Sequence, residues 1–290
     1  MLEIIQLAVS GLAMGFIYAL AGLSIFLIYN AGGVVNFAQG ALVMLGAYIS
    51  TSLLNTLELP YWLAIMLLIL IMAVIGIIFQ RFTYYPLRYT KGPMFMIAGI
   101  GVLVFLENMV QILWGTAPIA VRPMLSSQSL QIGGVFLDPQ SVMIILITGC
   151  IILVENFFLR KTALGKMTQA VAQDKDAASL MGISVSLMIC ITFANSTILA
   201  GITGVFVSPL FYVSISLSSL LLKAFAACVV GGFGNAKGAV VGGVIVGLVE
   251  TFGARFLSSQ YRDAYAFILL IAFLMLRPNG IFKERISEKV

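Results

Sequence analysis

Long apolar runs constrain this chain more than any other feature of its sequence. Runs of about 20 apolar residues follow one another through nearly the whole chain, and each could cross roughly 30 Å of hydrocarbon as a helix. Only 9% of the 290 residues are charged, against about 25% in a soluble domain. Short alternating strands of a membrane barrel are not apparent. The sequence therefore predicts an all-α, polytopic transmembrane helical bundle, with residues 1–290 as one domain.

The number of spans depends on one short segment. About nine crossings are expected if the segment from Ser216 to Gly232 spans the membrane, and about eight if it is re-entrant. Lys223 within it is expected to snorkel or to pair with a carboxylate. Basic residues gather in loops on one side, which places residues 160–187 and the C-terminal tail in the cytoplasm. The net charge of +5 thus reflects membrane orientation, and no nucleic-acid partner is expected.

Histidine is absent, and the three cysteines, Cys150, Cys190 and Cys228, each lie within an apolar run. Such thiols act most often as small packing residues. Without histidine, a cysteine pair or carboxylates at ligand spacing, the sequence predicts no catalytic residue and no metal site. A membrane-embedded enzyme is therefore not expected.

The stretch from Gln169 to Ser184 is predicted to dock a partner that drives the membrane part. Its composition favours a helix from Met167 to Met181, with Gly182 as a left-handed cap. Val171, Ala178, Leu180 and Met181 are expected to form an apolar patch that fits a groove on another protein. The predicted docking residues are Asp174, Ala177, Ala178, Leu180, Met181 and Gly182.

Polar residues inside or beside spans are candidates for a pathway or gate. A glycine pair, Gly32-Gly33, is expected to break the helix after the first span. The polar residues that follow, at the start of the second span, would either line a pathway or cap the helix. Glu107 is either a substrate or gate residue or an interfacial structural group. The sixth span offers a polar face for helix contacts or a narrow path. The candidates are Asn36, Gln39, Gly40, Glu107, Asn195 and Thr197.

Two further motifs predict local structure, a β-hairpin and a glycine-rich helix surface. SLQIGGVFLDP predicts an outward-facing β-hairpin that turns at Gly133-Gly134 and either caps the bundle or receives a substrate-delivering partner. A ridge of small residues for close helix packing is predicted near the eighth span. Its members are Gly234, Gly238, Gly242 and Gly247. The neighbouring GFGNAKGA lacks the Gly-Lys-Ser/Thr ending of a phosphate loop.

Four motifs, taken in order, carry a family resemblance. They are NFAQGALVMLGAY, AQDKDAASLMGIS, LKAFAACVVGGFGNAKGAVVGGVIVG and LRPNGIF. Together they resemble the LivH-type permease subunits of bacterial branched-chain amino acid ABC importers, over essentially the whole chain. The family often has histidine where this chain has Gln39, which argues against a protonation role there.

The resemblance implies a multi-pass permease of the inner membrane that moves branched-chain amino acids. It implies a related second permease, two cytosolic ATPases that hold ATP and Mg²⁺, and an extracytoplasmic substrate-binding protein, with no cofactor in this chain. Residues Ala172 to Ile183 would be the coupling element against the ATPase. Similar permeases serve urea, short amides or other amino acids, so the substrate stays open.

A stand-alone secondary transporter or channel is the alternative class. It would need ion-coupling groups near the bilayer midplane. The candidates are Glu107, Glu155 and Glu250, of which the first two lie towards span ends.

Overall fold

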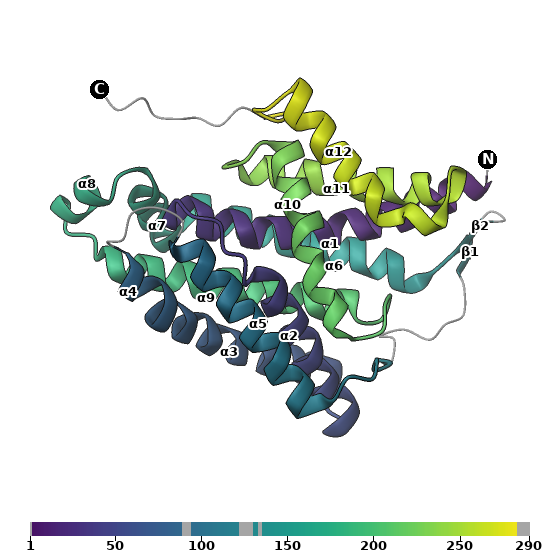
Figure 1. Ribbon diagram of the computed structural model, residues 1–290, viewed down its shortest axis with the longest axis horizontal. Helices are drawn as coiled ribbons and strands as arrows, with labels where there is room; N and C mark the ends of the chain where they lie inside the picture. Colours follow the sequence, from purple (N-terminus) through teal and green to yellow (C-terminus); the bar gives the residue numbers. More distant parts are fainter. Residues whose placement is uncertain (1, 89–93, 122–129, 133–134, 283–290) are drawn as a thin grey trace. The chain divides into compact units, whose positions relative to one another are not determined.

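The computed structural model describes residues 2–88, 94–121, 130–132 and 135–282 (Figure 1). The elements are α1 (Leu2–Gly32), α2 (Gln39–Thr51), the π-helix η1 (Ser52–Thr56), α3 (Tyr61–Phe79), the π-helix η2 (Gln80–Tyr84), α4 (Tyr85–Leu87), α5 (Met94–Trp114), β1 (Leu130–Ile132), β2 (Val135–Leu137), α6 (Pro139–Lys161), α7 (Ala163–Gln173), α8 (Lys175–Leu180), α9 (Val185–Val207), the 3₁₀ helix η3 (Ile215–Ser219), α10 (Leu220–Gly231), α11 (Ala236–Phe256), the 3₁₀ helix η4 (Ser259–Tyr261) and α12 (Arg262–Leu276). The basic tail residues Lys283, Arg285 and Lys289 lie outside the described residues.

The predicted helical membrane bundle is confirmed. In the described part of the chain, seven helices are long and apolar enough to cross a membrane, and a shorter apolar helix covers Ile215–Gly231. The predicted second span corresponds to α2 and η1, which together run from Gln39 to Thr56. Large apolar side chains also point outward from the long helices, as expected for groups in contact with lipid. Leu70, Phe105 and Leu153 are 64%, 65% and 69% exposed.

Contacts between Cα atoms divide the chain into two compact units, which are described separately. Of the described residues, unit 1 holds those within 2–23, 130–153 and 222–282. Unit 2 holds those within 24–121 and 154–221. The single domain over residues 1–290 stays a prediction.

Unit 2 is built on α9, which packs against both α2 and α3. Almost every residue of α2 is buried. Glycines let the two backbones approach: a Cβ at Gly46 would overlap the backbone of Gly201, and one at Gly204 would overlap the backbones of Val43 and Ala47. Close backbone approach is how membrane helices gain packing energy without a hydrophobic driving force between them. The start of α2 is therefore fixed against α9, which matters for the site below.

Unit 1 is built on the small residues of α11. Any side chain at Gly242 would overlap the backbone of Ala227, and any at Gly247 would overlap that of Gly15. Gly238 faces Gly231 in the same way. Gly234 does not belong to this ridge, because it lies before α11 in a turn with a φ of +91°, a conformation that favours glycine.

The predicted hairpin is present as two short strands. β1 and β2 are antiparallel, with Leu130 opposite Leu137 and Ile132 opposite Val135. The predicted turn at Gly133-Gly134 lies outside the described residues, and the outward orientation of the hairpin stays a prediction.

Candidate functional sites

A buried polar network surrounds the start of α2 in unit 2. The Asn36 side chain accepts a hydrogen bond from the Ala38 amide at 3.1 Å and donates one to Gln39 Oε1 at 3.2 Å. Gln39 Nε2 donates to Ser196 Oγ on α9 at 3.1 Å, and Ser196 Oγ donates to the Ser24 carbonyl at 2.6 Å. Asn36 and Gln39 are each 1% exposed. The network therefore satisfies polar groups where α1, α2 and α9 meet, away from solvent.

The next candidates gather around Ser218 of η3. The Ser218 hydroxyl donates to Glu107 Oε1 at 2.6 Å. The Ser218 carbonyl lies against Gly40, where any side chain would overlap it. Since Gly40 follows Gln39 directly, η3 and α5 close over the same end of α2 that carries the buried network. Gln39, Gly40 and Glu107 thus lie in one region of unit 2.

The two sixth-span candidates lie apart from this region's hydrogen bonds. Asn195 Nδ2 donates to Glu155 Oε1 on α6 at 2.7 Å. Asn195 also lines a small cavity of about 20 Å³ with Thr168 and Gln169, which is room for about one water. Thr197 is fully buried and donates only within its own helix in the bonds described, to the Phe193 carbonyl at 2.8 Å. A pathway role for these residues stays a prediction.

Replacing Gln39 with leucine tests the network. The leucine would leave the Ser196 hydroxyl and the Asn36 amide without their Gln39 partner in a buried site, and each such loss costs about 1–3 kcal/mol. Q39L should therefore unfold at lower temperature than the native chain in detergent, measured by circular dichroism. T197V is the matched control, because its hydroxyl bonds within one helix and should cost less. Equal shifts for both variants would contradict a network centred on Gln39.

The docking segment contains two helices where the sequence predicts one. α7 ends and α8 begins at Asp174, whose backbone is extended (φ −153°, ψ 112°). Its side chain accepts hydrogen bonds from the amides of Asp176 at 2.9 Å and Ala177 at 3.0 Å. Aspartate competes with helical hydrogen bonding in this way, so it favours a cap over a helix interior. The continuous helix predicted from Met167 to Met181 is wrong for this reason.

The apolar patch is also smaller than predicted. Val171 and Ala178 are 1% and 4% exposed and pack in the core of unit 2, whereas Leu180 and Met181 are 90% and 84% exposed. Ala178 therefore faces its own chain. The predicted cap at Gly182 is confirmed, because its φ is +82° and its amide donates to the Ser179 carbonyl at 3.0 Å. Leu180 and Met181, at the tip of α8, form the exposed apolar surface of the segment.

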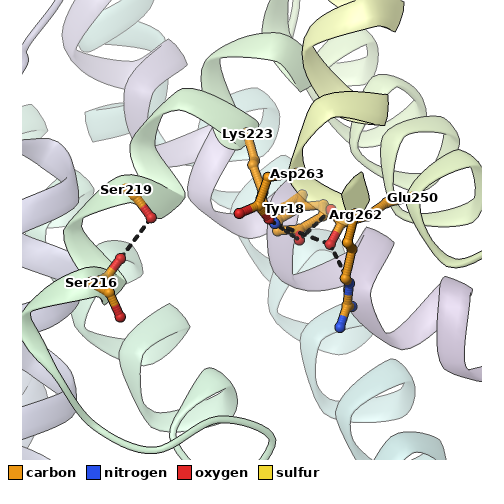
Figure 2. Close-up of polar contacts among 7 residues, drawn as sticks. All are labelled: Tyr18, Ser216, Ser219, Lys223, Glu250, Arg262 and Asp263. Carbon is orange, nitrogen blue, oxygen red and sulfur yellow. Dashed lines mark hydrogen bonds and ion pairs between the residues drawn. The ribbon is translucent and has the colours of Figure 1, made fainter. Parts of the chain in front are cut away.

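Unit 1 holds a charged cluster that sequence reasoning found only in part (Figure 2). Glu250 of α11 is fully buried and accepts from Tyr18 Oη at 2.7 Å. Its Oε1 lies 3.0 Å from Lys223 Nζ and 2.7 Å from Arg262 Nε. Lys223 also pairs with the exposed carboxylate of Asp263 at 2.6 Å. The cluster thus joins α1, α10, α11 and the start of α12.

The sequence indicates that Lys223 and Glu250 need partners, because both lie in apolar segments. The predicted pairing of Lys223 with a carboxylate is confirmed. The sequence did not identify Tyr18, Arg262 and Asp263 as members of the cluster. Tyr18 lies within a span and the two charged residues lie between spans, and neither position indicates a contact with α11. Among the described residues, no group of His, Cys, Asp and Glu side chains is placed to hold a metal ion.

Comparisons with known proteins cover the whole chain. Residues 7–275 match the profile of a family described as branched-chain amino acid transport system / permease component. The LivH permease protein of a high-affinity branched-chain amino acid transport system in Salmonella typhimurium is 30% identical over all of this chain and 98% of its own length. BraD, a permease protein of the corresponding Pseudomonas aeruginosa system, is 31% identical over 99% of this chain and 98% of its own length.

A solved structure shows a similar fold. It is a chain of PsaBC from Streptococcus pneumoniae in complex with Fab, with a TM-score of 0.53 and 13% identity. The similarity covers 96% of this chain and 92% of the other. At this identity it bears on the fold alone.

Proposed function

Since this chain belongs to the family of permease components of branched-chain amino acid transport systems, we propose that it is the permease subunit of an ATP-driven importer of branched-chain amino acids. The observation that carries the proposal is the similarity to the Salmonella LivH and Pseudomonas BraD permeases, which extends over at least 98% of this chain and of both relatives. The multi-pass helical fold provides the membrane part that such a subunit needs.

The same proposal includes the partners. A related second permease would complete the membrane part, two cytosolic ATPases would bind ATP and Mg²⁺, and an extracytoplasmic protein would deliver the substrate. The chain itself would not hydrolyse ATP. The apolar tip of α8, with Leu180 and Met181 exposed, has the chemistry of a partner contact and supports docking of the ATPases there. The chain would lie in the inner membrane with its C-terminus in the cytoplasm.

Reconstitution tests the proposal. The chain should be copurified with its bound subunits, placed in vesicles, and supplied with ATP and the binding protein that accompanies it. We expect ATP-dependent uptake of leucine, isoleucine or valine with the complete set, and none with this chain alone. Preferential uptake of urea or a short amide would still identify an ATP-driven importer, but one with a different substrate. Uptake by the chain alone, driven by a proton gradient, would instead establish a secondary transporter.

A further inference from the structure

A groove of about 360 Å³ opens at the end of unit 2 where η2 and α4 meet α8 and the start of α9. Figure 1 shows α4 and α8 at this end. The groove lies beside the exposed tip of α8 and is distinct from it, since neither Leu180 nor Met181 lines it. Its lining is mostly polar, aromatic or charged, and it includes Tyr84, Tyr85, Arg88, Lys175, Asp176 and Ser179.

Cations gather around its two tyrosines. The guanidinium groups of Arg81 and Arg88 lie 4.5 Å and 3.8 Å from the centroid of the Tyr85 ring. Lys175 Nζ donates to Tyr84 Oη at 3.3 Å. The lining itself holds two cations, Arg88 and Lys175, and one carboxylate, Asp176. Arg81 does not line the groove, but it adds a third positive charge at the ring of Tyr85. Guanidinium groups held on an aromatic ring are oriented in advance for a phosphate, because the stacking limits their rotation.

Exposed apolar side chains also lie within two residues, along the chain, of residues that line the groove. Ile78 at the end of α3 is 50% exposed, Phe82 of η2 is 77% exposed, and Leu187 in the first turn of α9 is 54% exposed. These helices are membrane spans, so the groove lies where the apolar surface of two spans meets polar residues. In a bilayer, such a boundary lies at the depth of the lipid headgroups, and basic pockets between spans suit anionic headgroups.

We propose that this groove binds the phosphodiester headgroup of an anionic lipid. Arg88 and Lys175 would contact the phosphate, and Arg81 would add positive charge at the Tyr85 ring. The hydroxyls of Ser179 and Ser186 can donate to headgroup oxygens, and the acyl chains would lie along Ile78, Phe82 and Leu187. A free phosphate offers the same anionic oxygens, but it would make no use of the apolar rim. The inference goes beyond transport and does not depend on which substrate the chain carries.

Lipid titration tests this site. Phosphatidylglycerol is titrated into the full chain, stripped of lipid in a neutral detergent, and the affinity of the tightest bound lipid is read by native mass spectrometry. The groove variant R81Q/R88Q should weaken that affinity by about fivefold for each cation removed. R88K keeps the charge but loses the planar stack, so it should fall between R81Q/R88Q and the native chain.

The matched control is R160Q/K161Q, which removes two exposed basic residues from the end of α6. It should change the affinity less than twofold. An equal loss in both double variants would overturn the site in favour of a diffuse basic surface. Inorganic phosphate and glycerophosphate, added at constant ionic strength, separate the two sources of phosphate. Binding of either as tight as that of the lipid would overturn the lipid as occupant. If R81Q/R88Q fails to fold by circular dichroism, K175Q and R88K carry the same test.

Discussion

Glu250→Gln is expected to lower the free energy of unfolding of unit 1 by about 3–5 kcal/mol, the usual cost of removing one partner from a buried ion pair. The carboxylate is fully buried, and both Lys223 and Arg262 lie within 3.0 Å of it. Glutamine has nearly the same shape and can still accept a bond from Tyr18, so the loss would come from charge. Lys223 and Arg262 would then both lose the negative charge that they share. Unfolding of the purified chain in detergent, followed by circular dichroism, measures the effect.

Asp263→Asn provides the matched control within the same cluster. Its side chain is 74% exposed, so its pair with Lys223 is screened by solvent and should contribute no more than about 1 kcal/mol. The double variant E250Q/R262Q removes one charge of each sign and should be less destabilised than the sum of its single changes. Equal stability of E250Q and the native chain would show that the cluster does not hold these helices together.

Leu180→Asp should sharply reduce ATP-dependent uptake in the reconstituted complex while leaving the helical content of the chain unchanged. Leu180 is 90% exposed, so a carboxylate there costs little in folding. A charge at the centre of an apolar contact with an ATPase would be buried without a partner, and such a penalty commonly exceeds 2 kcal/mol. We therefore expect uptake to fall by more than about tenfold. Uptake and ATP hydrolysis are measured on the same vesicles.

Leu257→Asp is the matched control, since Leu257 is 77% exposed and lies at the end of α11, outside the docking segment. It should transport normally. Gly182→Asp is a poorer test of docking, because its φ of +82° strains any side chain and would disturb the end of α8 itself. Normal uptake by L180D would mean that the tip of α8 is only a connection between α7 and α9.

The helical fold follows from the sequence because hydrocarbon leaves few alternatives. A chain with so little charge must satisfy its backbone internally, and apolar length then locates the long spans. The break at Asp174 could also have been predicted, since aspartate is a common N-cap residue whose side chain accepts hydrogen bonds from the backbone amides two and three residues later. Its flanking alanines favoured one continuous helix instead. Here the two hydrogen bonds that the Asp174 side chain accepts outweighed the helix propensity of the neighbouring residues.

The sites were less predictable, because their contacts join distant parts of the chain. Asn36 and Gln39 stand out as polar residues between apolar runs, but nothing in their spacing identifies Ser196 as their partner on α9. Arg262 reads as an ordinary basic residue between two spans, and only the fold brings it to Glu250. Burial likewise separates Ala178 from Leu180, two residues that look equally apolar in sequence.

The anchoring of α7 and α8 has a mechanical consequence. Val171 on one side of Asp174 and Ala178 on the other are both buried with Phe193 of α9 and Tyr84 of η2. The bend at Asp174 is therefore held in place, because α7 and α8 on either side of it are packed into the same hydrophobic core. We therefore expect a displacement of the exposed tip of α8 to move α9 as well, the helix that contacts α2 and the buried polar network.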